Sequence, residues 1–162
     1  MDQEYFQDYM PDNLCFGCGT QNQAGLQIKS YWEGEVSVCR WQPHARYQGW
    51  VGILNGGIIA TLIDCHCMGT AMAAAYRAEG RALHSEPVYR YATGTLNVKY
   101  LAPTSSLSPV ELRATVQQIK GRKVVLHCKV FSEDHPTAEA EVVAIRVTDS
   151  SQPVAQSPFS AT

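Results

Sequence analysis

The stretch Ile53–Tyr76, ILNGGIIATLIDCHCMGTAMAAAY, constrains the fold of this chain more than any other segment. Apolar and small residues fill almost every position from Ile58 onward, and no proline interrupts them. A helix that is apolar on all sides is buried in a core, whereas a surface helix is apolar along one stripe. We therefore expect one long central helix, ending near Gly80, that the rest of the chain surrounds.

One carboxylate, Asp64, lies in the middle of this apolar stretch. Burying an acid costs free energy unless the acid is hydrogen-bonded, paired or neutral, so its presence needs a reason. A hydrogen-bonded structural Asp is one explanation. Acids with shifted pKa values concentrate at functional sites, however, and we favour a catalytic role for Asp64.

The helix is expected to begin at Asn55-Gly56-Gly57, where Asn is a favoured N-cap and bare glycine amides can bind an anion. Gly57 and Asp64 share a helix face but stand about 10 Å apart along the axis. To act together, both groups must approach one carbonyl carbon closely. They can do so only if the helix packs against a second copy of itself, so we expect a homodimer or a dimer of dimers.

Strands are predicted on both sides of the helix from apolar runs between turn residues. Their ranges are Leu26–Tyr31, Val36–Trp41, Tyr91–Leu101, Val110–Ile119, Lys123–Phe131 and Ala138–Val147. We expect an α+β fold in which the last four strands form an antiparallel meander and the sheet curves around the helix. Residues 1–148 should form one domain, with a leader and turn at 1–25, and residues 149–162 a disordered tail.

The composition argues against several classes of partner. Charged residues make up 17% of the chain and the net charge is −2, so no broad basic surface is available for nucleic acid. No apolar signal segment follows Met1, and the long apolar stretch contains Asp64 and His66, which argues against a membrane span. We expect a cytoplasmic protein.

Six cysteines without a secretory signal are more typical of free thiols than of disulfides. Cys15 and Cys18 have the spacing of a metal-binding turn, but no second pair of Cys or His residues follows them. We interpret this segment as a turn with small buried thiols, and we expect neither a metal nor a cofactor.

Several short segments together carry a family resemblance. They are Gln48-Gly49, Gly52, Leu54–Gly57, Ala60-Thr61, Asp64, Thr93 and Leu96–Pro103, preceded by CFGCG and AGL. This pattern resembles the hotdog-fold thioesterases, in particular the PaaI-like and THEM-type acyl-CoA thioesterases, over residues 15–148. The resemblance implies a hotdog fold, a curved antiparallel sheet wrapped around one long helix. It also implies an acyl-CoA or related acyl thioester as substrate.

Carried over residue by residue, the resemblance assigns five catalytic positions, one of which, that of the family's His, holds Asn55 here. Asp64 becomes the general base or nucleophile, and Thr93 the hydroxyl that orients the water or the acid. The backbone N–H groups of Gly56 and Gly57 from the partner subunit become the oxyanion hole.

Four further residues are expected to bind the substrate. Gln48, Gly49 and Thr61 belong to the matching motif around the helix start. Arg90 is one of several arginines near the end of the helix, where a coenzyme A phosphate would find a cation. The alternative is that the Arg90 side chain is simply exposed to solvent and binds no ligand.

One position departs from the family pattern, because the residue before the two glycines is typically His and here it is Asn55. Asn can donate an amide hydrogen bond but does not titrate near neutral pH, and a plain N-cap would explain it equally. The alternative function is therefore a non-catalytic hotdog protein that binds acyl thioesters or lipids. A hydratase or dehydratase fits less well, because His44 is remote in sequence from Asp64.

Overall fold

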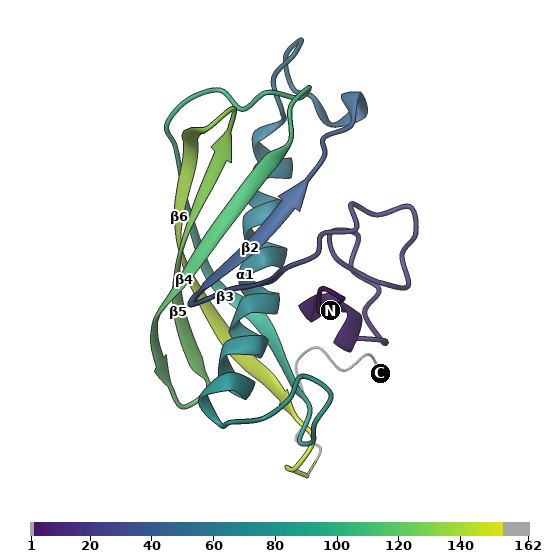
Figure 1. Ribbon diagram of the computed structural model, residues 1–162, viewed down its shortest axis with the longest axis vertical. Helices are drawn as coiled ribbons and strands as arrows, with labels where there is room; N and C mark the ends of the chain where they lie inside the picture. Colours follow the sequence, from purple (N-terminus) through teal and green to yellow (C-terminus); the bar gives the residue numbers. More distant parts are fainter. Residues whose placement is uncertain (1, 154–162) are drawn as a thin grey trace.

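The computed structural model describes residues 2–153, in which one antiparallel sheet packs against one long helix (Figure 1). The strands are β1 (Tyr31–Glu33), β2 (Val36–Trp41), β3 (Tyr89–Tyr100), β4 (Val110–Lys120), β5 (Lys123–Ser132) and β6 (His135–Asp149). The helix α1 spans Gly56–Ala78, and the 3-10 helices η1 (Phe6–Tyr9) and η2 (Ala45–Tyr47) lie in the connections. The predicted α+β class is confirmed.

Helix α1 has buried side chains on every side between Ile59 and Tyr76, which confirms the predicted core helix. It begins at the Asn55 cap and ends just before Gly80, whose φ of 65° is the left-handed conformation that commonly stops a helix. By length and composition α1 could also cross a membrane. However, 72% of its apolar window is buried inside the fold, as in a core helix.

The helix lies between two layers of different kinds (Figure 1). On one side the curved sheet covers it, and the main core contains Leu62 and Ile63 of α1 with Leu112, Leu126 and Val142 of the strands. On the other side the N-terminal segment crosses the helix, and a second cluster contains Phe6, Met72 and Tyr76. The leader is therefore part of the packing around α1.

The strand order is β1-β2-β4-β5-β6-β3, which corrects the predicted four-strand meander. Strands β4, β5 and β6 do form a meander, but β3 lies at the opposite edge and pairs with β6, with Leu96 opposite Val142. The connection after β3 crosses the sheet end near the helix start, where Leu54 N–H donates to the Thr104 carbonyl at 2.8 Å. Strand β4 can therefore pair with β2 in the sheet, far from β3.

The first predicted strand, Leu26–Tyr31, is wrong in its position, because β1 covers only Tyr31–Glu33. Leu26 and Ile28 are buried, which explains the strand-like alternation. Their amides donate to the carbonyls of Phe16 and Gly17 in the cysteine-containing turn rather than to a strand. In addition Gln27, with φ 55°, interrupts the extended backbone.

The C-terminal end of the sheet extends into the region where a tail was expected. Strand β6 continues to Asp149, and the Ser150 amide donates to the Val88 carbonyl at 3.0 Å. The remainder of the predicted tail, residues 154–162, lies outside the described residues.

Candidate active site

Asp64 of α1 and Thr93 of the edge strand β3 meet at the surface of the molecule, although they are far apart in the sequence. Asp64 is half-buried near the middle of α1, and its Oδ1 accepts a hydrogen bond from the Thr93 hydroxyl. In β3 the register with β6 shifts between Thr93 and Thr95, so Gly94 forms a bulge next to Thr93. Bulges reorient neighbouring side chains and are frequent beside active sites. The structure thus brings together two residues that the sequence had assigned to one site.

Burial raises the pKa of Asp64, and the nearby Cys15 also raises it, whereas the hydrogen bond from Thr93 lowers it. The net direction is upward. A carboxylate with a raised pKa accepts a proton more readily than an exposed one, and Thr93 holds one of its oxygens in a fixed position. This combination suits a general base.

The start of α1 shows what Asn55 does. Its side-chain oxygen accepts hydrogen bonds from the Gly57 amide at 2.8 Å and the Ile58 amide at 3.2 Å, so the N-cap interpretation is confirmed. The Gly56 N–H has no acceptor within residues 2–153, while its carbonyl accepts from the Tyr100 hydroxyl at 2.6 Å. Of the two glycine amides, only that of Gly56 has no acceptor among these residues.

The predicted substrate-binding residues near the helix start make local contacts. The Gln48 side chain accepts from the Gly52 amide at 3.1 Å, and the Gly49 amide donates to the Ile53 carbonyl at 2.8 Å. The Thr61 hydroxyl donates to the Gly57 carbonyl one turn earlier, at 3.0 Å. These bonds shape the loop before α1 and its first turns, so a substrate contact for these residues stays a prediction.

A cavity of about 690 Å³ adjoins Asp64. Its walls are largely apolar and come from the N-terminal segment, α1 and β3, and they include Met10, Leu14, Met68, Met72 and Tyr91. Arg90 also lines the cavity, and its guanidinium donates to Asp12 at 2.9 Å. The volume is in the usual range for small-molecule sites. The structure therefore places Arg90 and Asp64 on one cavity.

Sequence reasoning missed the part that the N-terminal segment plays in this cavity. The segment contributes Met10, residues 12–15 and Cys18 to the walls, and Cys65 of α1 lies directly against Cys15. The hydrogen bond between these two thiols lowers the pKa of Cys15 to about 5 and raises that of Cys65. The CFGCG motif was the one signal in the sequence that pointed to this contact.

His66 is a core residue whose two ring nitrogens both have hydrogen-bond partners. It is fully buried, with its Nδ1 2.8 Å from the Ser30 hydroxyl and its Nε2 3.3 Å from the Ser37 hydroxyl. Burial lowers the pKa of His66 to about 4, so it is neutral at physiological pH. It points away from the face that carries Asp64 and takes no part in the site.

Comparisons with known proteins agree with this architecture. The family model described as the thioesterase superfamily matches residues 51–139, a range that includes Gly56, Asp64 and Thr93. Among curated proteins, the acyl-coenzyme A thioesterase THEM4 of Rattus norvegicus is 33% identical over 108 residues, which cover 67% of this chain and 41% of that protein. The chain thus spans less than half the length of this relative.

Solved structures show the same fold. A thioesterase superfamily protein from Shewanella loihica is 35% identical, with a TM-score of 0.62 and coverage of 75% of this chain and 91% of that one. The PaaI protein of E. coli has a TM-score of 0.63 at 13% identity, covering 80% and 88%, a likeness that shows the fold alone. The expected hotdog fold is confirmed. Because the family model matches more than half of this chain, the chain belongs to the thioesterase superfamily.

Proposed function

We propose that this chain hydrolyses acyl-CoA thioesters, with Asp64 as the general base or nucleophile. The observation that carries the proposal is the Asp64 carboxylate, fixed by Thr93 at the wall of a largely apolar cavity of about 690 Å³. An acyl chain would fill such a cavity and bring its thioester carbonyl to the carboxylate. Membership of the thioesterase superfamily and the likeness to a protein named acyl-coenzyme A thioesterase support this reaction class.

As a general base, the Asp64 carboxylate removes a proton from water while the water oxygen attacks the carbonyl carbon. The tetrahedral intermediate then expels the coenzyme A sulfur, which takes up the proton, and a free acid and a thiol result. As a nucleophile, Asp64 instead displaces the sulfur itself to form an anhydride, which water then hydrolyses. The raised pKa of Asp64 favours the first route, because it strengthens the base.

The oxyanion hole in this proposal comes from the helix start of a second subunit. Within one chain, Gly57 and Asp64 are seven positions apart, which separates them by about 10 Å along the helix axis. Gly57, Thr61, Asp64 and Met68 form a stripe of incompletely buried positions along α1, and packing two such stripes in opposite directions would bring each Asp64 to the partner's helix start. The Gly56 amide would then be the principal donor, since Gly57 already donates to Asn55.

The remaining site residues have supporting roles in this proposal. Arg90, at the cavity wall, would bind a phosphate of coenzyme A or an acidic group of the substrate. Gln48, Gly49 and Thr61 would hold the loop and first turns against the bound thioester. The proposal also includes a cytoplasmic location and assembly of the chain into a dimer or a dimer of dimers.

The Asp64→Asn variant tests the proposal, because Asn has the same shape and can still accept the Thr93 hydrogen bond. Loss of a general base should lower the turnover of a panel of acyl-CoAs by at least about 100-fold, measured as release of free thiol. Circular dichroism and size-exclusion chromatography should match those of the wild type. Unchanged hydrolysis in a folded Asp64→Asn protein would reject the assignment.

Asn55 supports a second candidate, a hotdog protein that binds acyl thioesters without hydrolysing them. Its side-chain oxygen is occupied by the cap, and its amide does not titrate near neutral pH. If the wild type binds but does not hydrolyse the panel, and Asn55→His gains hydrolysis, this candidate is supported. Robust wild-type hydrolysis across the panel eliminates it.

A further inference from the structure

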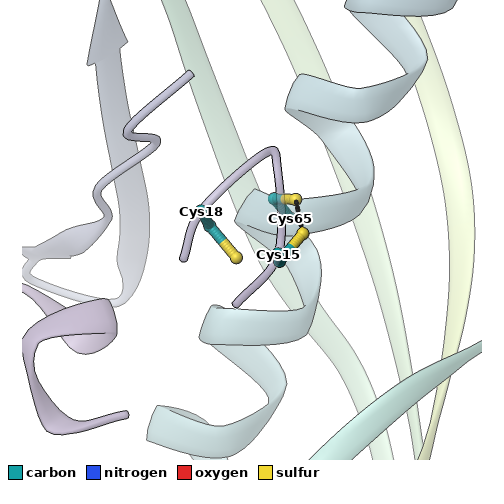
Figure 2. Close-up of side chains that lie close together, drawn as sticks. All are labelled: Cys15, Cys18 and Cys65. Atoms are coloured by element: carbon teal, nitrogen blue, oxygen red, sulfur yellow. Dashed lines mark hydrogen bonds between the residues drawn. The ribbon is translucent and has the colours of Figure 1, made fainter. Parts of the chain in front are cut away.

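Three cysteines that line the cavity bring their sulfur atoms close together, and Figure 2 shows how their side chains lie. Cys15 and Cys18 belong to the turn of the N-terminal segment, and Cys65 belongs to α1, fifty positions after Cys15. The Sγ atoms of Cys15 and Cys65 are 3.7 Å apart, and all three Sγ atoms lie within 4.8 Å of one another. All three are free thiols, so each sulfur is available as a ligand.

The turn that carries Cys15 and Cys18 points N–H donors at sulfur. The Gly17 amide donates to Cys15 Sγ at 3.3 Å, and the Asn13 side-chain amide donates to Cys18 Sγ at 3.3 Å. The Gly19 amide closes the turn on the Cys15 carbonyl at 2.7 Å. Donors around a sulfur stabilise its thiolate, the form that binds metal, and such outer contacts are typical of metal sites.

Two glycines in the same turn allow close approaches, Gly17 that of a sulfur atom from α1 and Gly19 that of the turn's own backbone. A Cβ at Gly17 would lie 2.4 Å from Cys65 Sγ, and a Cβ at Gly19 would lie 2.5 Å from the backbone N and O of Cys15. A side chain at Gly17 would force the turn and α1 apart, whereas one at Gly19 would clash within the turn itself. The sequence CFGCG therefore fits a close approach of the third sulfur from the helix.

We propose that Cys15, Cys18 and Cys65 bind a zinc ion through three thiolates, and that this ion ties the N-terminal segment to α1. A tetrahedral zinc ion with Zn–S bonds of about 2.3 Å has S–S edges of about 3.8 Å, which the Cys15–Cys65 pair already matches. The other sulfur pairs need to close by at most about 1 Å, because none exceeds 4.8 Å. Soft thiolates select zinc over the oxygen-binding Mg²⁺ and Ca²⁺.

The fourth coordination position faces the cavity. Among residues 2–153, no fourth His, Cys, Asp or Glu joins the cluster, and all three cysteines line the cavity wall. A water molecule or another small ligand would complete the tetrahedron there. On binding, each thiol releases its proton to the buffer as its sulfur bonds to zinc. This assignment replaces the metal-free turn inferred from sequence, because Cys65 supplies the ligand that no second motif provided.

Metal loading of the whole chain tests the proposal without reference to its activity. Reduced protein is incubated with Zn²⁺, freed of excess metal by gel filtration and analysed for metal and protein. We expect about one zinc per chain in the wild type and in Cys39→Ala, a matched control that removes a buried thiol of β2 outside the cluster. The Cys65→Ser and Cys15→Ser variants should each bind much less than one zinc per chain.

Cobalt provides a spectroscopic readout of the ligands. Co²⁺ in place of zinc should give sulfur-to-cobalt charge-transfer bands and the strong visible bands of a four-coordinate ion, both absent in Cys65→Ser. Chelation should lower the Tm of the wild type and of Cys39→Ala but leave that of Cys15→Ser unchanged. If Cys65→Ser fails to fold, the half-exposed Cys15→Ser answers the same question.

Three results would overturn the zinc assignment. Reduced wild-type protein that takes up almost no metal would do so, as would full loading of both serine variants. The third is reduced protein that forms a Cys15–Cys65 disulfide in air yet binds no cobalt before oxidation. Loss of thioesterase activity alone, with normal metal loading, would count against the proposed function and leave the zinc site standing.

Discussion

Asp64 is subject to two opposing effects. Burial raises its pKa, and the Thr93 hydroxyl lowers it by donating to the carboxylate. A general base must be ionised to accept a proton, so the Thr93 bond controls both its orientation and its ionised fraction. In the proposed mechanism Thr93 is therefore a positioning residue, because it would act on the reaction through Asp64.

Replacing Thr93 by Val should remove this control while keeping the shape of the side chain. Loss of a hydrogen bond to a charged group, worth about 1.5–3 kcal/mol, should lower kcat roughly 10- to 100-fold with little change in KM. The acidic limb of the pH–rate profile should move to higher pH, because the donor that lowers the pKa of Asp64 is gone. Thr93→Ser is the matched control and should behave like the wild type. An unmoved acidic limb in Thr93→Val would contradict this role.

Individual site residues could be predicted to different extents. Asp64 and Asn55 were evident from residue type alone, because an acid in an apolar helix is costly and Asn is a favoured N-cap. Thr93 required the family resemblance, and the structure confirms its contact with Asp64. The contact between Cys15 and Cys65 was out of reach, since it depends on how the N-terminal segment crosses α1.

At the scale of elements, local sequence patterns predicted helix α1 but not which strands pair. Helix α1 is encoded by its own cap, composition and terminal glycine, so its bounds followed from the sequence. The place of β3 beside β6 depends on contacts about 50 residues away in the chain, which no local pattern specifies. For the same reason Leu26 and Ile28 were assigned to a strand, although they pack beneath the cysteine-containing turn.

His66 connects three elements, because it contacts Ser30 of the N-terminal segment and Ser37 of β2 from its position on α1. Its pKa is lowered from 6.5 to about 4 by burial. Between these values the unfolded chain binds the proton that the folded chain excludes, so stability is full above pH 6.5 and declines as the pH falls toward 4. The loss should reach about 3 kcal/mol.

Urea unfolding at pH 7 and pH 4, in reductant and chelator so that bound metal does not contribute, measures this loss. The His66→Gln variant, which does not titrate, should lose about 3 kcal/mol less over the same interval. The folded imidazole can also be titrated directly by NMR in the wild type. An imidazole pKa near 6.5 in the folded protein would refute the prediction, whether or not the variant folds.

At the scale of the whole molecule, the proposed site belongs to two chains. Strand β3 lies at the sheet edge with exposed residues from Thr93 to Thr95, and α1 has its incompletely buried stripe nearby. Both features allow a second copy to pack edge to edge or helix to helix. The sequence could indicate this arrangement only indirectly, through the distance between the helix start and Asp64.

The proposed oxyanion donor, the backbone N–H of Gly56, can be removed by the Gly56→Pro variant. Proline is tolerated at the first position of a helix, and Asn55 before it has the extended backbone (ψ 136°) that a following proline requires. The variant deletes one N–H and should lower kcat by about 100- to 1000-fold, as loss of an oxyanion donor does. Gly56→Ala keeps the N–H and is the control, since a Cβ there meets the Tyr100 ring at an ordinary 3.5 Å.

Mixing two inactive variants then tests whether the two halves of the site come from different chains. In a heterodimer of Asp64→Asn and Gly56→Pro, one site has both defects and the other has neither. Random mixing at equal amounts makes about half of the dimers heterodimers, so about a quarter of wild-type activity should return. The readout is thiol release from an acyl-CoA after co-refolding of the two chains, with each variant refolded alone as the control. If both groups acted within one chain, every site would carry one defect and no activity would return, so the amount recovered discriminates directly between a shared site and a site within one subunit.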